Sequence, residues 1–143
     1  MHELTGGCHC CNIKVVYRTM IAPEDSVPRA CQCSFCRKQN TRAVSDPKGT
    51  LAITVGNESR LSRYRFGLAI ADYLVCRECG IYVAAFMTDA DRSHGFATLM
   101  ANALDAHARY PAALPIDYDG EDEAARSGRR RQRWTPATLK TGS

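Results

Sequence analysis

Three cysteines lie within six residues in the segment Cys31-Gln32-Cys33-Ser34-Phe35-Cys36. A Cys-x-Cys step followed by Cys-x-x-Cys can fold into a tight loop that turns all three sulfurs toward one point. Three thiolates at one point suit Zn²⁺, which takes sulfur ligands at about 2.3 Å in tetrahedral geometry. Three protein ligands leave the fourth position open, as in working zinc sites. The segment therefore predicts a zinc site that accepts an outside ligand.

Two further cysteine clusters flank this segment in the chain. The first is Gly6-Gly7-Cys8-His9-Cys10-Cys11, where the glycines allow a sharp turn. The second is Cys76-Arg77-Glu78-Cys79-Gly80, a Cys-x-x-Cys-Gly zinc-knuckle pattern in which glycine relieves the strain of the turn. One closed four-cysteine site follows from the two outer pairs, and Cys11 is left over. Its ligands would be Cys8, Cys10, Cys76 and Cys79.

Other uses of the eight cysteines stay open at this point. Four disulfides would also use them all, but Cys-x-Cys pairs make strained bridges. Both zinc sites could be structural, with Cys11 or a histidine closing the central one, or a single zinc could leave the central cysteines free. We favour the open central site. For Cys11 we favour a buried apolar role.

Composition indicates one globular domain that stays in a reducing compartment. The 143 residues can bury a core without staples, and the 45% hydrophobic content is ordinary. The first five residues carry no basic run or apolar stretch typical of a signal peptide, and no apolar run approaches the roughly 20 residues of a membrane span. We therefore expect a cytoplasmic protein with reduced thiols. The net charge of +4 is too mild to indicate nucleic acid by itself.

The elements that would position these clusters are short strands. Alternation of apolar and polar residues predicts a strand over 12–18, and apolar runs predict strands over 51–55, 61–66, 72–75 and 81–86. Residues 96–106 suit either a helix or a strand. Pro111 and Pro115 mark a loop. For the tail we expect a short helix and then a frayed end.

The three cysteine motifs in this order resemble the glutathione-dependent formaldehyde-activating enzyme family, which also includes centromere protein V. The family pattern is Gly-x-Cys-x-Cys, Cys-x-Cys-x-x-Cys and Cys-x-x-Cys-Gly, and the match runs from about residue 4 to about residue 106. It is a specific indication of the family and a weak one of the substrate. Cys11 departs from the pattern, because the family usually has glycine there. If that position needs a positive φ, a cysteine is strained.

The resemblance implies a mainly β protein, a β-tent fold of small antiparallel sheets held by zinc knuckles, with a strand within 96–106. It divides the chain into a zinc-binding domain over residues 1–110 and a C-terminal extension of the same domain over 111–143. It implies two zinc ions: a structural one in the outer four-cysteine site, and an exchangeable one on Cys31, Cys33 and Cys36, which would carry the chemistry.

That chemistry would be carbon–sulfur bond formation between a thiol and an aldehyde, with glutathione and formaldehyde as the reference pair. A zinc with an open position lowers the pKa of an incoming thiol and holds it beside the carbonyl carbon. Glutathione carries two carboxylates, so Arg37 and Lys38 are the candidates to bind it. We interpret His9 as an exposed spacer. His94 is a candidate acid or base, although no general base is assigned.

A binding module without catalysis is the competing hypothesis. The feature that favours it is the basic run Arg129-Arg130-Arg131-Gln132-Arg133 followed by Trp134, the minimum for phosphate contact and base stacking. The run is short and follows acidic residues that could pair with it. We therefore expect small-molecule partners, no membrane and no nucleic acid; the sequence does not indicate an oligomeric state.

Overall fold

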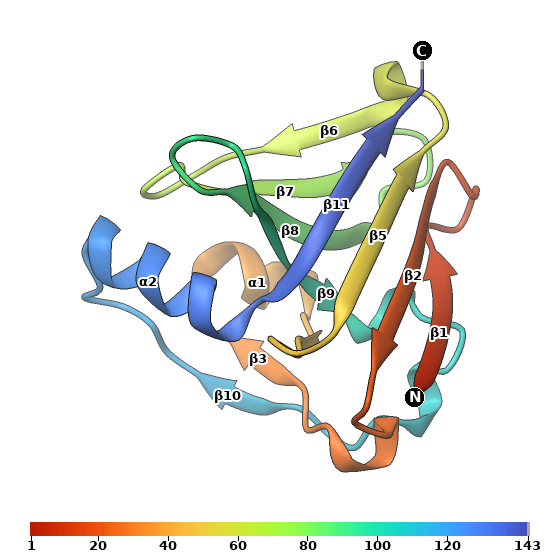
Figure 1. The fold of residues 1–143 in the computed structure, drawn as a ribbon, viewed down its shortest axis with the longest axis horizontal. Helices are drawn as coiled ribbons and strands as arrows, with labels where there is room; N and C mark the ends of the chain where they lie inside the picture. The colour runs from red at the N-terminus through yellow and green to blue at the C-terminus, as the bar shows by residue number, and fades with distance from the viewer. Residues whose placement is uncertain (143) are drawn as a thin grey trace.

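The computed structural model describes residues 1–142, and the chain is mainly β as the sequence predicts (Figure 1). Eleven strands join into one mixed sheet, with two α-helices beside it. The strands are β1 (His2–Gly7), β2 (Ile13–Thr19), β3 (Arg29–Cys31), β4 (Ala43–Val44), β5 (Thr50–Val55), β6 (Leu61–Tyr64), β7 (Asp72–Cys76), β8 (Tyr82–Thr88), β9 (Gly95–Met100), β10 (Leu114–Ile116) and β11 (Thr135–Thr141). The helices are α1 (Ser34–Gln39) and α2 (Glu123–Arg133).

Short 3₁₀ turns occupy residues 23–25, 58–60, 101–103 and 107–109. Neither helix has the length and apolar character that a membrane span requires within the described residues.

The sheet branches at β9. One path runs β1-β2-β5-β11-β9-β4-β3-β10, and the meander β6-β7-β8 joins it at β9. Figure 1 shows the two parts at an angle, with β1, β2, β5 and β11 running steeply and β6 and β7 running across the direction of β5 and β11. The resemblance implied antiparallel sheets, whereas two of the pairs, β5 with β11 and β3 with β10, are parallel.

Alternating apolar residues place the core on one face of β2 and β5. Ile13, Val15 and Tyr17 are at most 3% exposed. They pair directly with Val55, Ile53 and Leu51 across the antiparallel ladder. Such cross-strand pairs stabilise a sheet and fix its register, because a slip by one residue would turn the apolar set outward.

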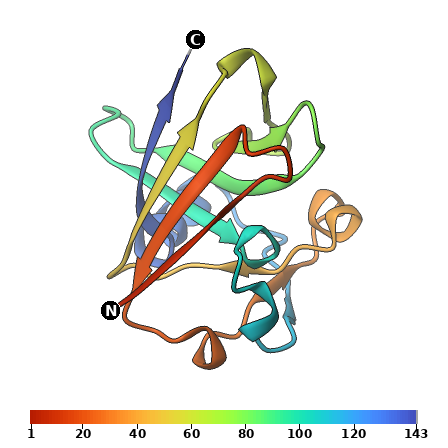
Figure 2. The same ribbon diagram turned by 90° about the vertical axis from the view of Figure 1, so that its right-hand side faces the viewer.

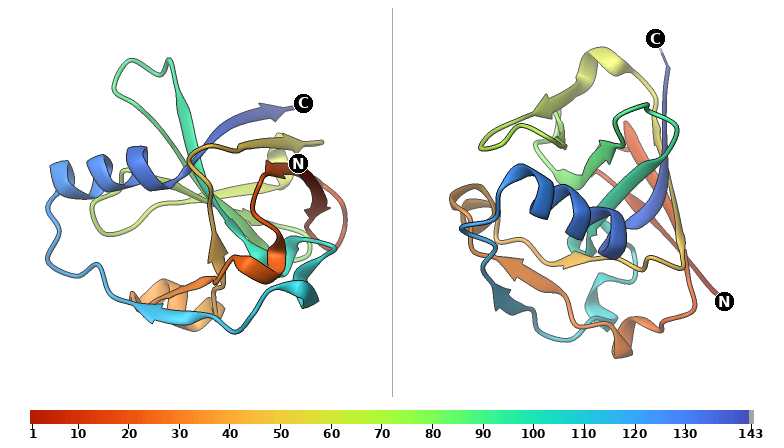
Figure 3. Two further views of the ribbon diagram at one scale, coloured as in Figure 1. Left: turned by 60° about the horizontal axis from the view of Figure 1, so that its bottom comes forward. Right: turned by 60° about the vertical axis from the view of Figure 1, so that its left-hand side comes forward.

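The C-terminal tail differs from the expectation. Residues 135–141 do not fray: they form β11, which lies between β5 and β9 in the middle of the sheet. Figure 3 shows α2 leading into the start of this strand. The expected short C-terminal helix is present, and Asp122 caps it by accepting a 2.8 Å hydrogen bond from the Ala125 N–H.

Residues 96–106, for which we considered a strand or a helix, contain a strand followed by a short helical turn. Residues up to Met100 form β9, and a 3₁₀ turn follows at Ala101 to Ala103. The helical turn α1 was not anticipated, because only six residues form it. Its start is capped by the Cys33 sulfur, which accepts a hydrogen bond from the Cys36 N–H at 3.3 Å.

Candidate metal centres and active site

The four outer cysteines come together as the sequence predicts. Their sulfurs all lie within 4.8 Å of one another. The Cys10 sulfur is 3.8 Å from that of Cys8 and 3.5 Å from that of Cys76. Four sulfurs around a zinc at about 2.3 Å would be about 3.8 Å apart, so the donor set fits a tetrahedral Zn²⁺. Figure 2 shows the loop after β1 beside the β7–β8 turn.

Backbone geometry presents each pair of sulfurs. The Ile13 N–H donates to the Cys8 sulfur at 3.2 Å, and Cys8 is buried. In the β7–β8 turn, Gly80 has φ of +79° and its N–H donates to the Cys76 carbonyl at 2.9 Å. Glycine adopts this conformation without steric cost, which is the role predicted for Gly80. The turn that we expected at Gly6 and Gly7 follows them in the chain instead, since both glycines belong to β1.

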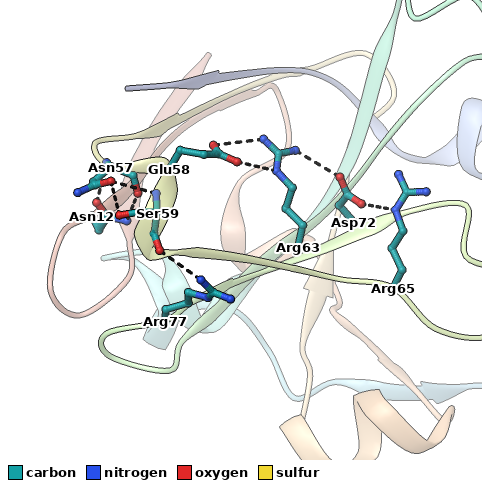
Figure 4. Close-up of polar contacts among 8 residues, drawn as sticks. All are labelled: Asn12, Asn57, Glu58, Ser59, Arg63, Arg65, Asp72 and Arg77. Carbon is teal, nitrogen blue, oxygen red and sulfur yellow. Dashed lines mark hydrogen bonds and ion pairs between the residues drawn. The ribbon is translucent and has the colours of Figure 1, made fainter. Parts of the chain in front are cut away.

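A polar network braces this site from outside (Figure 4). Asn12 and Asn57 exchange hydrogen bonds: the Asn12 side chain donates to the Asn57 carbonyl and accepts from the Asn57 N–H. Arg77 bonds the Ser59 carbonyl at 3.4 Å. The turn at residues 57–60 therefore joins the loop of the first cluster to the knuckle of the last.

Cys11 lies outside both clusters. Its side chain is exposed, so the expected buried role is wrong. Its backbone has φ of +71°, the left-handed conformation in which a side chain other than glycine is strained. A glycine, which the resemblance led us to expect at this position, would adopt that conformation without strain.

The central three cysteines also converge. The sulfurs of Cys31, Cys33 and Cys36 lie within 4.8 Å of one another. Cys31 ends β3, Cys33 caps α1, and Cys36 lies one turn into the helix. Cys36 is buried, whereas Cys31 and Cys33 are half-buried. The set fits a soft metal ion with three protein ligands, and no fourth Cys, His, Asp or Glu of residues 1–142 joins it.

Hydrogen bonding within this cluster separates its pKa values. A hydrogen bond from Cys36 lowers the pKa of Cys31 to about 5, although burial acts in the opposite direction. The same hydrogen bond, together with burial, raises the pKa of Cys36. The shift favours the thiolate form of Cys31, which is the form of sulfur that binds a metal cation.

A cavity of about 700 Å³ opens at the cluster. Cys31 and Cys33 form part of its wall, and α2 forms another. Aromatic rings of Phe66, Tyr73 and Tyr118 line it between these walls. The charged lining residues are Arg37, Asp117, Asp119, Arg126, Arg129 and Arg130. A cavity of this size admits a small organic ligand beside the sulfurs.

A second hollow of about 50 Å³ is also lined by Cys31, together with Cys36. Two buried polar atoms in its wall, the Thr41 hydroxyl and Nε of Arg130, have no hydrogen-bond partner in the part of the chain that the structure describes. Arg29 also lines it, and its guanidinium donates to Ser45 and Thr98 at 2.9 Å each. Burial lowers the pKa of Arg29 and of Arg130.

The remaining predicted residues fall in different places. Arg37 lines the large cavity, but Lys38 is exposed and does not. His9 is an exposed spacer, as interpreted. His94 lies on the β8–β9 connection, 3.1 Å from the Asp89 carboxylate, and lines neither hollow at the cysteines. Trp134 is only 4% exposed, so it offers no free face for base stacking.

Comparison with known proteins agrees with this geometry. Residues 3–116 match the sequence model of a family described as glutathione-dependent formaldehyde-activating enzyme. The chain belongs to this family. Both cysteine clusters fall within the matched residues, and the family's glutathione and formaldehyde are small molecules that suit a cavity rather than a flat surface.

The formaldehyde-activating family match ends before α2 and β11, but a structural likeness continues through them. The crystal structure of a Rhodobacter sphaeroides protein is similar to this chain with a TM-score of 0.51 and 18% sequence identity. The alignment covers 96% of this chain and 99% of the Rhodobacter chain. At this identity the likeness concerns the fold alone.

Sequence reasoning missed the contribution of α2 to the cavity. Arg126, Arg129 and Arg130 recur at helical spacing, which places them on one face of a helix. That signal was available, but the run 129–133 was considered only as a nucleic-acid contact and set aside. The aromatic wall gave no comparable signal, because Phe66, Tyr73 and Tyr118 meet only through tertiary packing.

Proposed function

We propose that the protein catalyses carbon–sulfur bond formation and cleavage between a thiol and an aldehyde, a lyase-type reaction with glutathione and formaldehyde as reference substrates. The observation that carries the proposal is the opening of the three-cysteine cluster onto a cavity of about 700 Å³. A purely structural zinc site is closed by four protein ligands and needs no such space.

The three cysteines would hold the working metal. Cys36, buried behind the loop, would anchor it, and Cys31 and Cys33 would present it to the cavity. A zinc ion bound there would supply a soft Lewis acid that lowers the pKa of a substrate thiol. Cys8, Cys10, Cys76 and Cys79 would hold a second, structural zinc.

The reaction balances without any oxidant. The substrate sulfur forms a bond to the aldehyde carbon, the carbonyl double bond becomes a single bond, and the proton lost by sulfur ends on the new hydroxyl. Cleavage is the reverse. The protein's contribution is orientation: the cavity holds both partners together and Arg37 stands at its wall to meet a carboxylate. We assign no role to Lys38, since it lies outside the cavity.

The proposal includes a cytoplasmic location, because thiolate ligands and free thiol substrates require a reducing environment. It treats residues 1–110 as the zinc-binding domain and 111–143 as an extension that completes the cavity through Tyr118 and α2.

The test is exchange NMR on glutathione and formaldehyde at equilibrium, with and without catalytic amounts of zinc-loaded protein. We expect the protein to accelerate exchange between glutathione and its hydroxymethyl adduct. Cys33→Ser should abolish the acceleration and remove one zinc per chain. Cys11→Ser is the matched control, since this exposed thiol lies outside both clusters.

The alternative, a zinc-structured binding module without catalysis, predicts a different pattern. Exchange would proceed at the uncatalysed rate, and both zinc ions would be held tightly whether or not glutathione is added. That pattern would overturn the proposed function and direct attention to macromolecular partners.

A further inference from the structure

We propose that the cavity face of α2, formed by Arg126, Arg129 and Arg130, is a carboxylate-binding subsite that selects acidic thiols as substrates. The inference rests on the proposed function only in assigning the thiol to the cysteines; anion binding to the arginines is testable without it. Neither α2 nor its arginines lie within the residues matched to the family.

The central observation is the state of Arg130. Its side chain is buried, 6% exposed, yet no carboxylate of residues 1–142 pairs with it. Its Nε has no hydrogen-bond partner among the described residues, and its one contact through Nη2 is a 3.4 Å bond to the Tyr73 hydroxyl. A buried guanidinium left unpaired is costly, whereas one that receives a carboxylate is strongly stabilised. Arg130 lines the large cavity as well as the small hollow, so a carboxylate bound in the cavity would lie beside its guanidinium and offset its charge.

An aromatic ring holds the Arg130 side chain in place in the absence of a ligand. Its guanidinium lies over the Trp134 ring, 4.6 Å from the centroid, one helical turn further along. Burial lowers its pKa from the usual value, but arginine keeps its charge at any physiological pH. The side chain is thus oriented before any ligand arrives, which reduces the entropy lost on binding.

The two neighbouring arginines are fixed by a carboxylate from the protein itself. Glu121 accepts hydrogen bonds from Arg129 at 2.9 Å and from Arg126 at 3.3 Å. Arg129 also lies over the Tyr118 ring, 3.5 Å from its centroid. With the bond from Arg126 to the Tyr118 carbonyl counted, Nη1 of each arginine still makes no hydrogen bond among the described residues, so the two can share a second carboxylate beside Glu121.

Two acidic residues on the cavity wall indicate a second charged group on the ligand. Asp117 and Asp119 are exposed at its rim and make no ion pair within residues 1–142. They suit an ammonium group on the same molecule. Together with Phe66 and Tyr73, which offer apolar surface, the lining fits a thiol that carries a carboxylate and an ammonium group, as amino acids and short peptides do.

The experiment uses S-methylglutathione, which has two carboxylates and an ammonium group but no thiol, and its diethyl ester, which lacks both negative charges. Binding to the zinc-loaded full chain is measured by calorimetry and by fluorescence of Trp134, the single tryptophan, which contacts Arg130. We expect the acid to bind at least about tenfold more tightly than the ester, as one charged hydrogen bond warrants.

Variants separate ligand binding from a structural role. Arg130→Met should weaken binding of the acid by about tenfold to a hundredfold, and Arg130→Lys should restore part of it. Arg133→Met is the matched control, because Arg133 is exposed on the same helix and lines neither hollow at the cysteines. Should Arg130→Met fail to fold, Arg126→Gln gives the same comparison. Arg126 is half-buried, and we expect a smaller loss of affinity for the acid.

Equal affinity for acid and ester, no binding of either, or equal binding by Arg130→Met and Arg133→Met would overturn the proposal and leave Arg130 as a counter-charge to the cysteine cluster. The two proposals fail separately. Selective binding of the acid without accelerated glutathione–formaldehyde exchange would end only the proposed function. Accelerated exchange without acid selectivity would end only the carboxylate subsite.

Discussion

The sulfurs of Cys10 and Cys76 lie 3.5 Å apart, although 66 residues separate them in the chain. Cys10 belongs to the turn after β1, and Cys76 ends β7 in the other part of the branched sheet. A metal bound by these residues would therefore close a long loop and hold the two parts together, where a cross-link constrains the unfolded chain most.

Cys76→Ser is therefore expected to unfold the chain, whereas Cys33→Ser is expected to keep the fold. Structural zinc contributes about 10 kcal/mol or more in small metal-dependent folds, which is comparable to the whole stability of a domain. Zinc content per chain and circular dichroism, measured on both variants, check this. Equal loss of structure in the two variants would mean that the central cluster is structural as well.

The cysteine spacing made both sulfur clusters predictable, because tight Cys-x-Cys and Cys-x-x-Cys turns present neighbouring sulfurs together. The position of β11 was not predictable in the same way. Its sequence, with Pro136 and a preceding basic run, carries weak local strand signals, and its parallel pairing with β5 depends on long-range packing.

The residues that line the cavity were also only partly predictable from the sequence. Arg37 and Lys38 were both candidates because they follow Cys36, but only Arg37 lines the cavity. Arg130 reaches the same cavity from a helix almost a hundred residues away, and only the fold reveals that its guanidinium is buried and unpaired.

Cys11→Gly should stabilise the protein. With φ of +71°, the cysteine side chain is strained by about 1–2 kcal/mol, and glycine relieves this at a smaller cost in chain entropy. We expect a net gain of about 0.5–1 kcal/mol in the free energy of unfolding, measured by urea denaturation. Cys11→Ala keeps the Cβ and should show no such gain. A loss of stability in Cys11→Gly would show that the thiol makes a stabilising contact.

Trp134→Ala should be among the most damaging single substitutions outside the cysteines. The ring is 4% exposed, belongs to a buried cluster with Tyr82 and Met100, and marks the junction of α2 with β11. Truncating a buried tryptophan costs about 3–5 kcal/mol. Thermal and urea unfolding measure the loss. Leu114→Ala, at a side chain 63% exposed, serves as the control and should change stability by less than about 0.5 kcal/mol. A small effect at Trp134 would mean that β11 is held mainly by its backbone pairing.

Stability should fall at alkaline pH because of the tyrosines that folding buries. Burial raises the pKa of Tyr110 from 10.0 to about 12, and burial also raises the pKa of Tyr17, Tyr73 and Tyr82. Above pH 10 the unfolded chain loses these protons while the folded chain retains them, so stability is unchanged below pH 10 and declines between pH 10 and pH 12. Each tyrosine would contribute a slope of up to about 1.4 kcal/mol per pH unit.

Urea midpoints across this range, with phenolate absorbance recorded in parallel, measure the decline. Tyr110→Phe should remove its own part of the decline, whereas Tyr64→Phe, at a ring 48% exposed, should leave it as in the wild type. A decline of equal steepness in Tyr110→Phe would assign the alkaline transition to groups other than this tyrosine.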